Sequence, residues 1–214
     1  MKPLAAVLTG DLIASTEAGP VATNRAIEVL SEAAGRLSDW AGADTRFTRH
    51  RGDGWQLYLE FPGLVLRATV YLTACLRAND TGLATRISAA IGRVDHLDAK
   101  DLSSASGEAF TIAGQNLDMM PRTKRFALGN WMTVNKWQVS IFDLVDWQSR
   151  RWSREQAEAV ALALPPEEPT QGQIALRLGI TRQALQARLN SAGLSAMTEA
   201  LCSFESHDWQ EEVA

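Results

Sequence analysis

The sequence contains few cysteines and no long apolar segment, and each shortage excludes a class of protein. Only two cysteines occur among 214 residues, so a disulfide framework is excluded. We expect Cys75 and Cys202 to be reduced core residues of a cytoplasmic protein. No apolar run is long enough to span a membrane, and the N-terminus predicts a buried first strand rather than a signal peptide. The formal net charge of −4 lacks the positive excess of proteins that coat nucleic acid, so any DNA contact requires a local basic surface.

The order of the predicted elements favours one α+β domain in residues 1–150. Apolar spacing predicts, in order, a strand at 4–9, a helix at about 20–40, a hairpin around Asp53, a helix from Pro62, a strand at 85–94, a helix at 107–120, a strand at 126–135 and a helix at about 139–147. An antiparallel sheet with helices on one face would bury these apolar stripes. The order is that of a ferredoxin-like, split βαβ arrangement.

Two Gly-Asp pairs give this domain its candidate metal site. Asp53 lies in the stretch Arg51–Trp55 between two strand-like flanks, where Asp-Gly favours a two-residue hairpin turn. Asp11 follows the first strand. If the two strands are neighbours, the two carboxylates can bind Mg²⁺ or Mn²⁺ together with a phosphate. The alternative is that Asp53 is only a turn residue.

The residues that follow Asp11 form a candidate phosphate loop. Ser15 and Thr16 would place two hydroxyl groups and free backbone N–H groups beside the carboxylate. The same residues are also typical of an ordinary helix cap. Both interpretations remain open from the sequence.

Residues 151–214 predict a small all-α domain. Ser153 and Gln156 form a capping-box pattern before an apolar helix, and a proline-rich break follows at 165–169. Two short helices then flank Gly179, and Thr181 caps the second, which is the spacing of a helix-turn-helix. The tail at 203–214 is acidic, and we expect it to be partly frayed.

The second of these helices is the candidate DNA-binding element. Arg182, Gln183, Gln186 and Asn190 are predicted to point away from the core and are of the types that pair with base edges, and Arg188 adds a charge for phosphates. The segment 170–198 contains arginines and no acidic residue, so it is a basic patch in an acidic chain. The alternative is a dimerisation or packing module with the same topology.

Taken in order, several motifs resemble the class III nucleotide cyclase fold and, more closely, the SatD family of bacterial proteins. They are Thr9–Ser15, Gly52–Gln56, Arg86–Gly92 and Gly107–Phe110. The resemblance implies that Asp11 and Asp53 are the metal-binding carboxylates of the cyclases. It places Arg49 where cyclases have a base-selecting lysine. SatD-like proteins often carry a C-terminal helix-turn-helix.

The same resemblance also shows where the sequence departs from an active cyclase. Asn116 matches an asparagine of the cyclase helix, but the transition-state arginine falls on Met120, and Arg122 is two residues late. Loss of that charge would remove a main electrostatic contribution to phosphoryl chemistry.

Three hypotheses follow from these patterns. The first is a cytoplasmic, dimeric regulator of transcription, which binds double-stranded DNA and senses a nucleotide-type ligand through Asp11, Asp53, Ser15, Thr16 and Arg49. The second is a divergent cyclase that uses Mg²⁺ or Mn²⁺, with Asn116 and Arg122 as catalytic candidates. The third is a scaffold whose C-terminal module binds protein.

Overall fold

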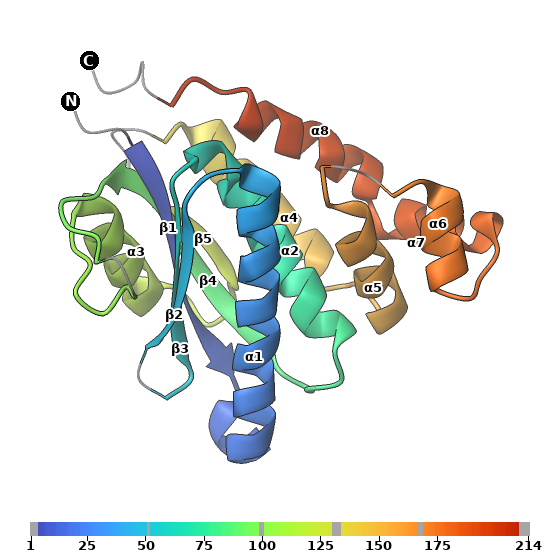
Figure 1. The fold of residues 1–214 in the computed structure, drawn as a ribbon, viewed down its shortest axis with the longest axis horizontal. Coiled ribbons are helices and arrows are strands. Elements are labelled where there is room, and N and C mark those ends of the chain that lie inside the picture. Colours follow the sequence, from blue (N-terminus) through green and yellow to red (C-terminus); the bar gives the residue numbers. More distant parts are fainter. Residues whose placement is uncertain (1–3, 51, 99–100, 130–133, 167–168, 210–214) are drawn as a thin grey trace.

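The computed structural model describes residues 4–50, 52–98, 101–129, 134–166 and 169–209, and it is built around a five-stranded sheet (Figure 1). The strands are β1 (Leu4–Ile13), β2 (Thr45–His50), β3 (Gly54–Leu59), β4 (Ala84–Arg93) and β5 (Phe126–Gly129), in the order β2-β3-β1-β4-β5. The first four pair antiparallel, and β5 adds parallel to β4. This order confirms the predicted α+β, ferredoxin-like fold.

Helices cover both faces of the sheet, whereas the sequence predicted helices on one face. One face packs against α1 (Ser15–Ala41), the short 3-10 turn Pro62–Leu64, α2 (Val65–Ala78) and α4 (Lys136–Ser149). The other face packs against α3 (Glu108–Met119), and Phe110 of α3 and Val7 of β1 belong to the same buried cluster. Both Val7 and Leu8 have no exposed surface. The continuous apolar run of β1 requires cover on both sides, and α3 supplies the second layer.

Two local predictions at the start of the chain are corrected. The first strand extends to Ile13, so Asp11 lies inside β1 rather than in a loop before the helix. The hairpin has a three-residue connection, 51–53, rather than a two-residue turn. Gly52, with φ of 70°, has the left-handed backbone conformation that glycine adopts easily. This residue lies one position before Asp53 rather than after it. Arg51 lies outside the described residues.

The C-terminal part forms four helices: α5 (Arg154–Ala163), α6 (Gln171–Arg177), α7 (Arg182–Ala192) and α8 (Leu194–Glu205). The capping box at Ser153 and the cap at Thr181 are present as predicted. The expectation of a frayed tail from residue 203 is wrong as far as residue 209. Phe204 and Trp209 are buried, and the indole N–H of Trp209 donates to the Phe204 carbonyl at 3.1 Å. Residues 210–214 lie outside the described residues.

The C-terminal helices and the sheet domain share one continuous hydrophobic core. Trp152 is 1% exposed, and α5 packs along α2. Arg67 of α2 forms a salt bridge with Glu205 of α8 and donates to the carbonyl of Leu164 at 2.6 Å. The two parts are therefore held in a defined relation by buried contacts.

Two further findings concern the shortages noted in the sequence. Cys75 is buried, but Cys202 is exposed, so the expectation that both are core residues is wrong for Cys202. Cys202 lies on the outer side of α8, opposite the buried Leu201 and Phe204. Within the described ranges, no helix combines the length and apolar character needed to cross a membrane.

Candidate functional site at the end of the first strand

The sheet brings the two predicted carboxylates to the same place. Asp11 pairs in register with Gly54 of β3, which is the residue after Asp53. On its other side Asp11 pairs with Arg86 of β4. The central position of β1 therefore places Asp11 between the hairpin turn and the start of β4.

Arg86 engages Asp11 through both carboxylate oxygens. Its Nε donates to Oδ1 at 2.9 Å, and its Nη2 donates to Oδ2 in a closer contact. The side chains are 27% and 28% exposed. This hydrogen bonding raises the pKa of Arg86, and the negative charges of Asp11, Asp118 and Asp53 act in the same direction. The cation that neutralises Asp11 is thus a residue of the chain itself.

Asp53 also has an internal partner. The hydroxyl of Ser15, in the first turn of α1, donates to Asp53 Oδ2. The helix is not capped by Ser15 or Thr16, because its N-cap residue is Ala14, in a left-handed conformation with φ of 62° and no side-chain cap. The cap interpretation of these hydroxyls is therefore wrong, and Ser15 instead connects α1 to the hairpin.

A groove of about 370 Å³ lies beside the hairpin and gathers the other predicted ligand-binding residues. Ser15, Thr16, Arg49 and Asp53 all line it. Arg49 is held by the hairpin, since its Nε donates to the Gly52 carbonyl at 2.7 Å and its Nη1 donates to Asn24 Oδ1 at 2.9 Å. The predicted nucleotide-binding residues are thus neighbours, and both Arg49 and Asp53 have internal partners.

The remaining cyclase-like positions lie on α3 and just after it. Asn116 is half-buried, and its Nδ2 lies 1.6 Å from where a Cβ on Gly129 would stand, so Gly129 makes room for it. Met120 is 6% exposed and belongs to the apolar interior. Arg122 is exposed. The residue of α3 whose charge acts on Arg86 is Asp118, and its negative charge raises the pKa of Arg86.

In this arrangement the carboxylates of Asp11 and Asp53 are engaged by other side chains and are not free to bind a divalent cation. Both Asp11 oxygens are engaged by Arg86, and one Asp53 oxygen accepts from Ser15. In the part of the chain that the structure describes, no three side chains of His, Cys, Asp or Glu are grouped to hold a metal. Binding Mg²⁺ or Mn²⁺ at Asp11 and Asp53 stays a prediction and requires Arg86 to move away.

The predicted DNA-binding residues lie on the outer side of α7. Arg182, Gln183, Gln186 and Asn190 are exposed, and Arg188 is half-exposed. Leu185 and Leu189 are buried beneath them. The Gln186 amide donates to Asn190 Oδ1 at 2.7 Å. These polar groups therefore form one accessible face.

Sequence reasoning missed Arg86 and Asp118 as members of the Asp11 cluster. Arg86 carries a charge at the start of a strand that is otherwise largely apolar, which is a signal in the sequence. The residue facing it depends on strand register, however, and register is fixed only when the sheet forms. Asp118 precedes the exposed Met119 and gives no comparable signal.

Comparisons with known proteins complete the description of this region. No protein-family model and no curated protein matches the chain. Solved structures similar to it include a bacterial light-regulated adenylyl cyclase, at 14% identity and a TM-score of 0.40, with 58% of this chain and 74% of that chain covered. A guanylyl cyclase is 12% identical with a TM-score of 0.41 and the same coverage. A further structure of a bacterial light-regulated adenylyl cyclase is 16% identical, with a TM-score of 0.39, and covers 58% and 42% of the two chains. The likeness concerns the fold, which the strand order establishes independently.

Proposed function

We propose that this protein is a cytoplasmic, DNA-binding regulator of transcription whose cyclase-like domain responds to a nucleotide-type ligand. The observation that carries the proposal is the exposed face of α7, with Arg182, Gln183, Gln186 and Asn190 directed away from the buried Leu185. Arg, Gln and Asn are the side chains that pair bidentately with base edges in the major groove.

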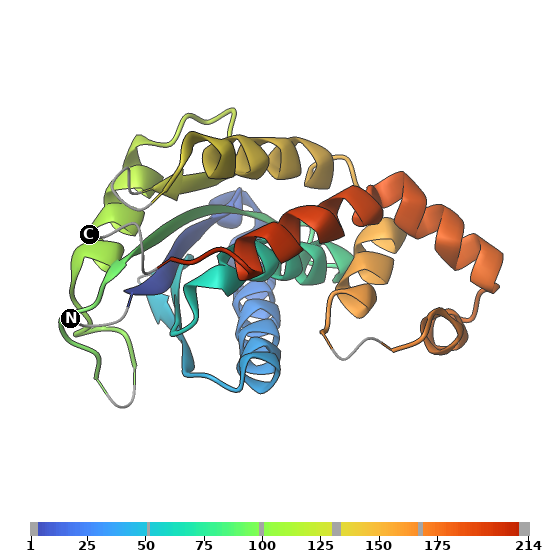
Figure 2. The same cartoon turned by 90° about the horizontal axis from the view of Figure 1, so that it is seen from above.

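The place of α6 and α7 in the molecule supports this proposal. Figure 2 shows both helices at one end of the molecule, away from the sheet. The turn between them spans residues 178–181, as in a helix-turn-helix, where the second helix enters the major groove. The segment 170–198 has arginines and contains no acidic residue of its own, a composition that favours contact with a phosphate backbone.

The cyclase-like domain is better suited to sensing than to catalysis. Arg86 neutralises Asp11, and Met120 is buried where the cyclase resemblance expects an arginine. Neither feature favours the alternative of a divergent cyclase. Binding a nucleotide-type ligand does not require the transition-state arginine. The groove beside the hairpin still supplies arginine, hydroxyl and amide side chains for such a ligand.

The test is DNA binding measured by fluorescence anisotropy. The probe is the upstream region of the protein's own gene, with an unrelated duplex as control and with salt as a variable. Replacing Arg182 by Ala should weaken specific binding by about 1–3 kcal/mol, which is about fivefold to 150-fold, and should reduce the salt dependence. Arg93→Ala, at an exposed arginine of β4, removes the same charge elsewhere and should leave affinity unchanged. Absence of salt-sensitive binding to every duplex tested would refute the proposal.

A second copy of the chain completes the proposed regulator, because helix-turn-helix proteins commonly bind paired half-sites as dimers. The surface we propose for it is the apolar groove between α4 and α8, of about 370 Å³, lined by residues that include Ile141, Leu144, Trp147 and Met197. Leu144 and Trp147 are 66% and 50% exposed, and exposed apolar patches of this kind mark interaction surfaces.

Light scattering tests the dimer. The wild-type protein should have twice the mass of the chain, and Leu144→Glu should yield monomers because a carboxylate would be buried unpaired. Lys136→Glu changes charge on the same helix near its start and serves as the control. A monomeric wild-type protein that still binds DNA tightly would contradict the dimer.

A further inference from the structure

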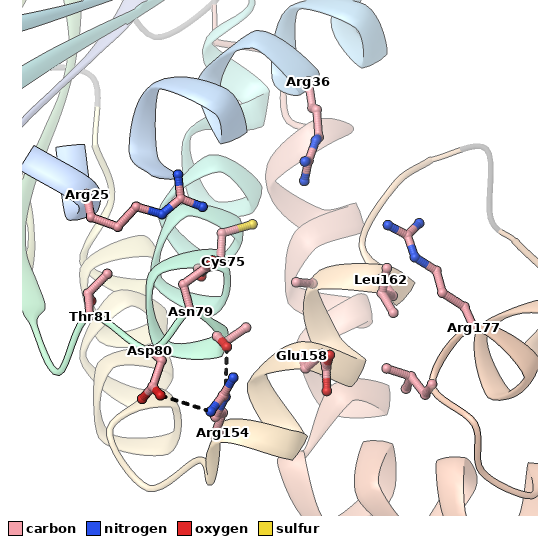
Figure 3. Close-up of a pocket in the computed structure, with 13 residues that line it drawn as sticks. Arg25, Arg36, Cys75, Asn79, Asp80, Thr81, Arg154, Glu158, Leu162 and Arg177 are labelled. Carbon is pink, nitrogen blue, oxygen red and sulfur yellow. Dashed lines mark hydrogen bonds and ion pairs between the residues drawn. The ribbon is translucent and has the colours of Figure 1, made fainter. Parts of the chain in front are cut away.

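A groove of about 590 Å³ lies between the cyclase-like domain and the C-terminal helices, away from the Asp11 cluster (Figure 3). Its walls come from α1, the end of α2, α5 and the end of α6. Four arginines line it: Arg25 and Arg36 from α1, Arg154 from α5 and Arg177 from α6. Figure 3 shows their guanidinium groups extending toward the space between these helices. The fold thus gathers cations from distant parts of the chain around one opening.

Two of these arginines form no ion pair with a carboxylate of the described residues. Arg36 donates to the Tyr71 hydroxyl at 3.3 Å, which is a neutral acceptor, and Glu32 acts on it only as a nearby charge. The side chain of Arg177 is exposed and makes no hydrogen bond or ion pair within the described residues. A bound anion would supply the charged partner that these two guanidinium groups lack there.

The other two arginines have partners that an anion can replace. Arg25 lies 3.2 Å from Glu28 and 3.6 Å from Glu32, and all three side chains are at least half exposed. Arg154 lies 3.6 Å from Asp80, whose side chain is 88% exposed, and also donates to the Ala78 carbonyl at 3.0 Å. Exposed ion pairs of this kind are worth little, so a phosphate can compete for these guanidinium groups.

Five apolar residues also line the groove, and we call them its floor: Cys75, Ala78, Ala161, Leu162 and Leu178. The volume falls in the range of small-molecule sites, which combine apolar walls with a few directed polar groups. An inorganic phosphate would leave this floor uncovered, whereas a flat organic group would bury it.

The acidic residue Glu158, which also lines the groove, further restricts the class of ligand that fits there. It is exposed, and its carboxylate has no hydrogen-bond or ion-pair partner among the described residues. A carboxylate repels phosphate but accepts hydrogen bonds from hydroxyl or amino groups. A ligand with phosphates at one end and such donors at the other satisfies both the arginines and Glu158.

We propose that this groove binds a nucleotide, with its phosphates on Arg36 and Arg177 and its base on the floor at Leu162. Such a ligand would connect α1 to the end of α6, immediately before the turn that leads into α7. Binding would then bias the position of the DNA-facing helix. This regulatory consequence rests on the proposed function, whereas the binding itself does not.

Calorimetry on the full chain tests the binding, with ATP, GTP and tripolyphosphate as probes at physiological salt. A nucleotide should bind, and tripolyphosphate should bind more weakly because it cannot cover the floor. Arg36→Ala and Arg177→Ala should each weaken nucleotide binding about tenfold or more, since each removes a charge-assisted hydrogen bond. Arg93→Ala is the control for lost charge, and Arg49→Ala tests the groove beside the hairpin as the competing nucleotide site.

Three results would overturn the inference. One is the absence of binding by all three probes. Another is nucleotide binding that is abolished by Arg49→Ala and unaffected by Arg36→Ala, which would move the site to the hairpin. The third is equal affinity for tripolyphosphate and nucleotide, which would remove the role of the floor.

The regulatory consequence is tested separately. Arg182→Ala should weaken DNA binding while nucleotide binding stays intact, and Arg36→Ala should remove the effect of nucleotide on DNA affinity while basal DNA binding stays intact. If the protein binds nucleotide but no DNA duplex, the proposed function is refuted, and the proposal that the groove binds nucleotide is retained. If DNA binds and no nucleotide does, the groove fails and DNA regulation stands.

Discussion

The two charged regions of this molecule differ in how their charges are matched. At the end of β1, Asp11 is held by Arg86 and Asp53 by Ser15, so each carboxylate has a partner from the chain. In the groove lined by α1, α2, α5 and α6, Arg36 and Arg177 form no ion pair with a carboxylate of the described residues. In the first region the carboxylates are already paired within the protein. In the second region the arginines can accept a bound anion as their partner.

This difference shows why a motif alone does not locate a ligand. Asp11 and Asp53 stand out in the sequence because each follows a glycine, and the fold brings them together. The fold also brings Arg86 to them, which changes what the pair can do. The arginines of the groove belong to no motif, and only the packing of α1, α5 and α6 assembles them.

The largest expected effect concerns the packing beneath the Asp11 cluster. A Cβ added at Gly10 would lie 2.4 Å from Trp55 Cζ2 and 2.5 Å from the carbonyl oxygen of Arg86. Gly10→Ala should therefore destabilise the protein by about 3 kcal/mol, because neither the fully buried indole nor the strand can move away easily. Urea denaturation measures the change.

Gly35→Ala is the matched control for that substitution. Gly35 lies within α1, and a Cβ there would meet nothing within 4 Å. This variant should be more stable than the wild type by about 0.5–1 kcal/mol, because alanine favours the helix. Equal effects at the two glycines would show that the Asp11 region is loosely packed and free to rearrange around a ligand.

A smaller effect is expected when the cation of the cluster is removed. Arg86→Met should lower stability by about 1–2 kcal/mol, since the paired charges are partly exposed and partly screened. The freed carboxylate of Asp11 should then bind Mn²⁺ together with the neighbouring Asp53, so Mn²⁺ should raise the melting temperature of the variant and not of the wild type.

The control for this cation test is Arg93→Met, which should gain no response to Mn²⁺. If Mn²⁺ stabilises the wild-type protein and Asp53→Asn abolishes that effect, Arg86 yields to a metal. The Asp11 cluster would then be a ligand site as well, and it would no longer differ from the arginine-lined groove in this respect.

The smallest effect concerns the two thiols and reports on the floor of the groove. Burial raises the pKa of Cys75 to about 11, so its reactive thiolate is scarce at neutral pH, whereas Cys202 is exposed. A thiol reagent should modify Cys202 quickly and Cys75 slowly, and the slow rate should rise as the pH approaches 11. In Cys202→Ser, ATP should slow the remaining reaction further, because Cys75 lines the groove. An unchanged rate with ATP bound would place the nucleotide elsewhere.

Much of the fold could be predicted from the sequence because its signals are local. Apolar spacing identified α1 and α2, and Asp-Gly with its strand-like flanks identified the hairpin. Ser153 and Thr181 cap the helices they were expected to cap, because a cap needs only residues a few positions away. The sequence also placed Asp11 and Asp53 in one region, since their strands were expected to be neighbours.

Other features depended on contacts between distant residues. The strand register set Arg86 against Asp11, and no local pattern encodes that pairing. Phe204 and Trp209 made the expected tail an ordered part of the core by packing near Phe142. The sequence by itself determined the strands, the helices and their caps, because these depend on near neighbours. Only the tertiary structure decided which charges are matched, because matching requires side chains from separate elements to meet.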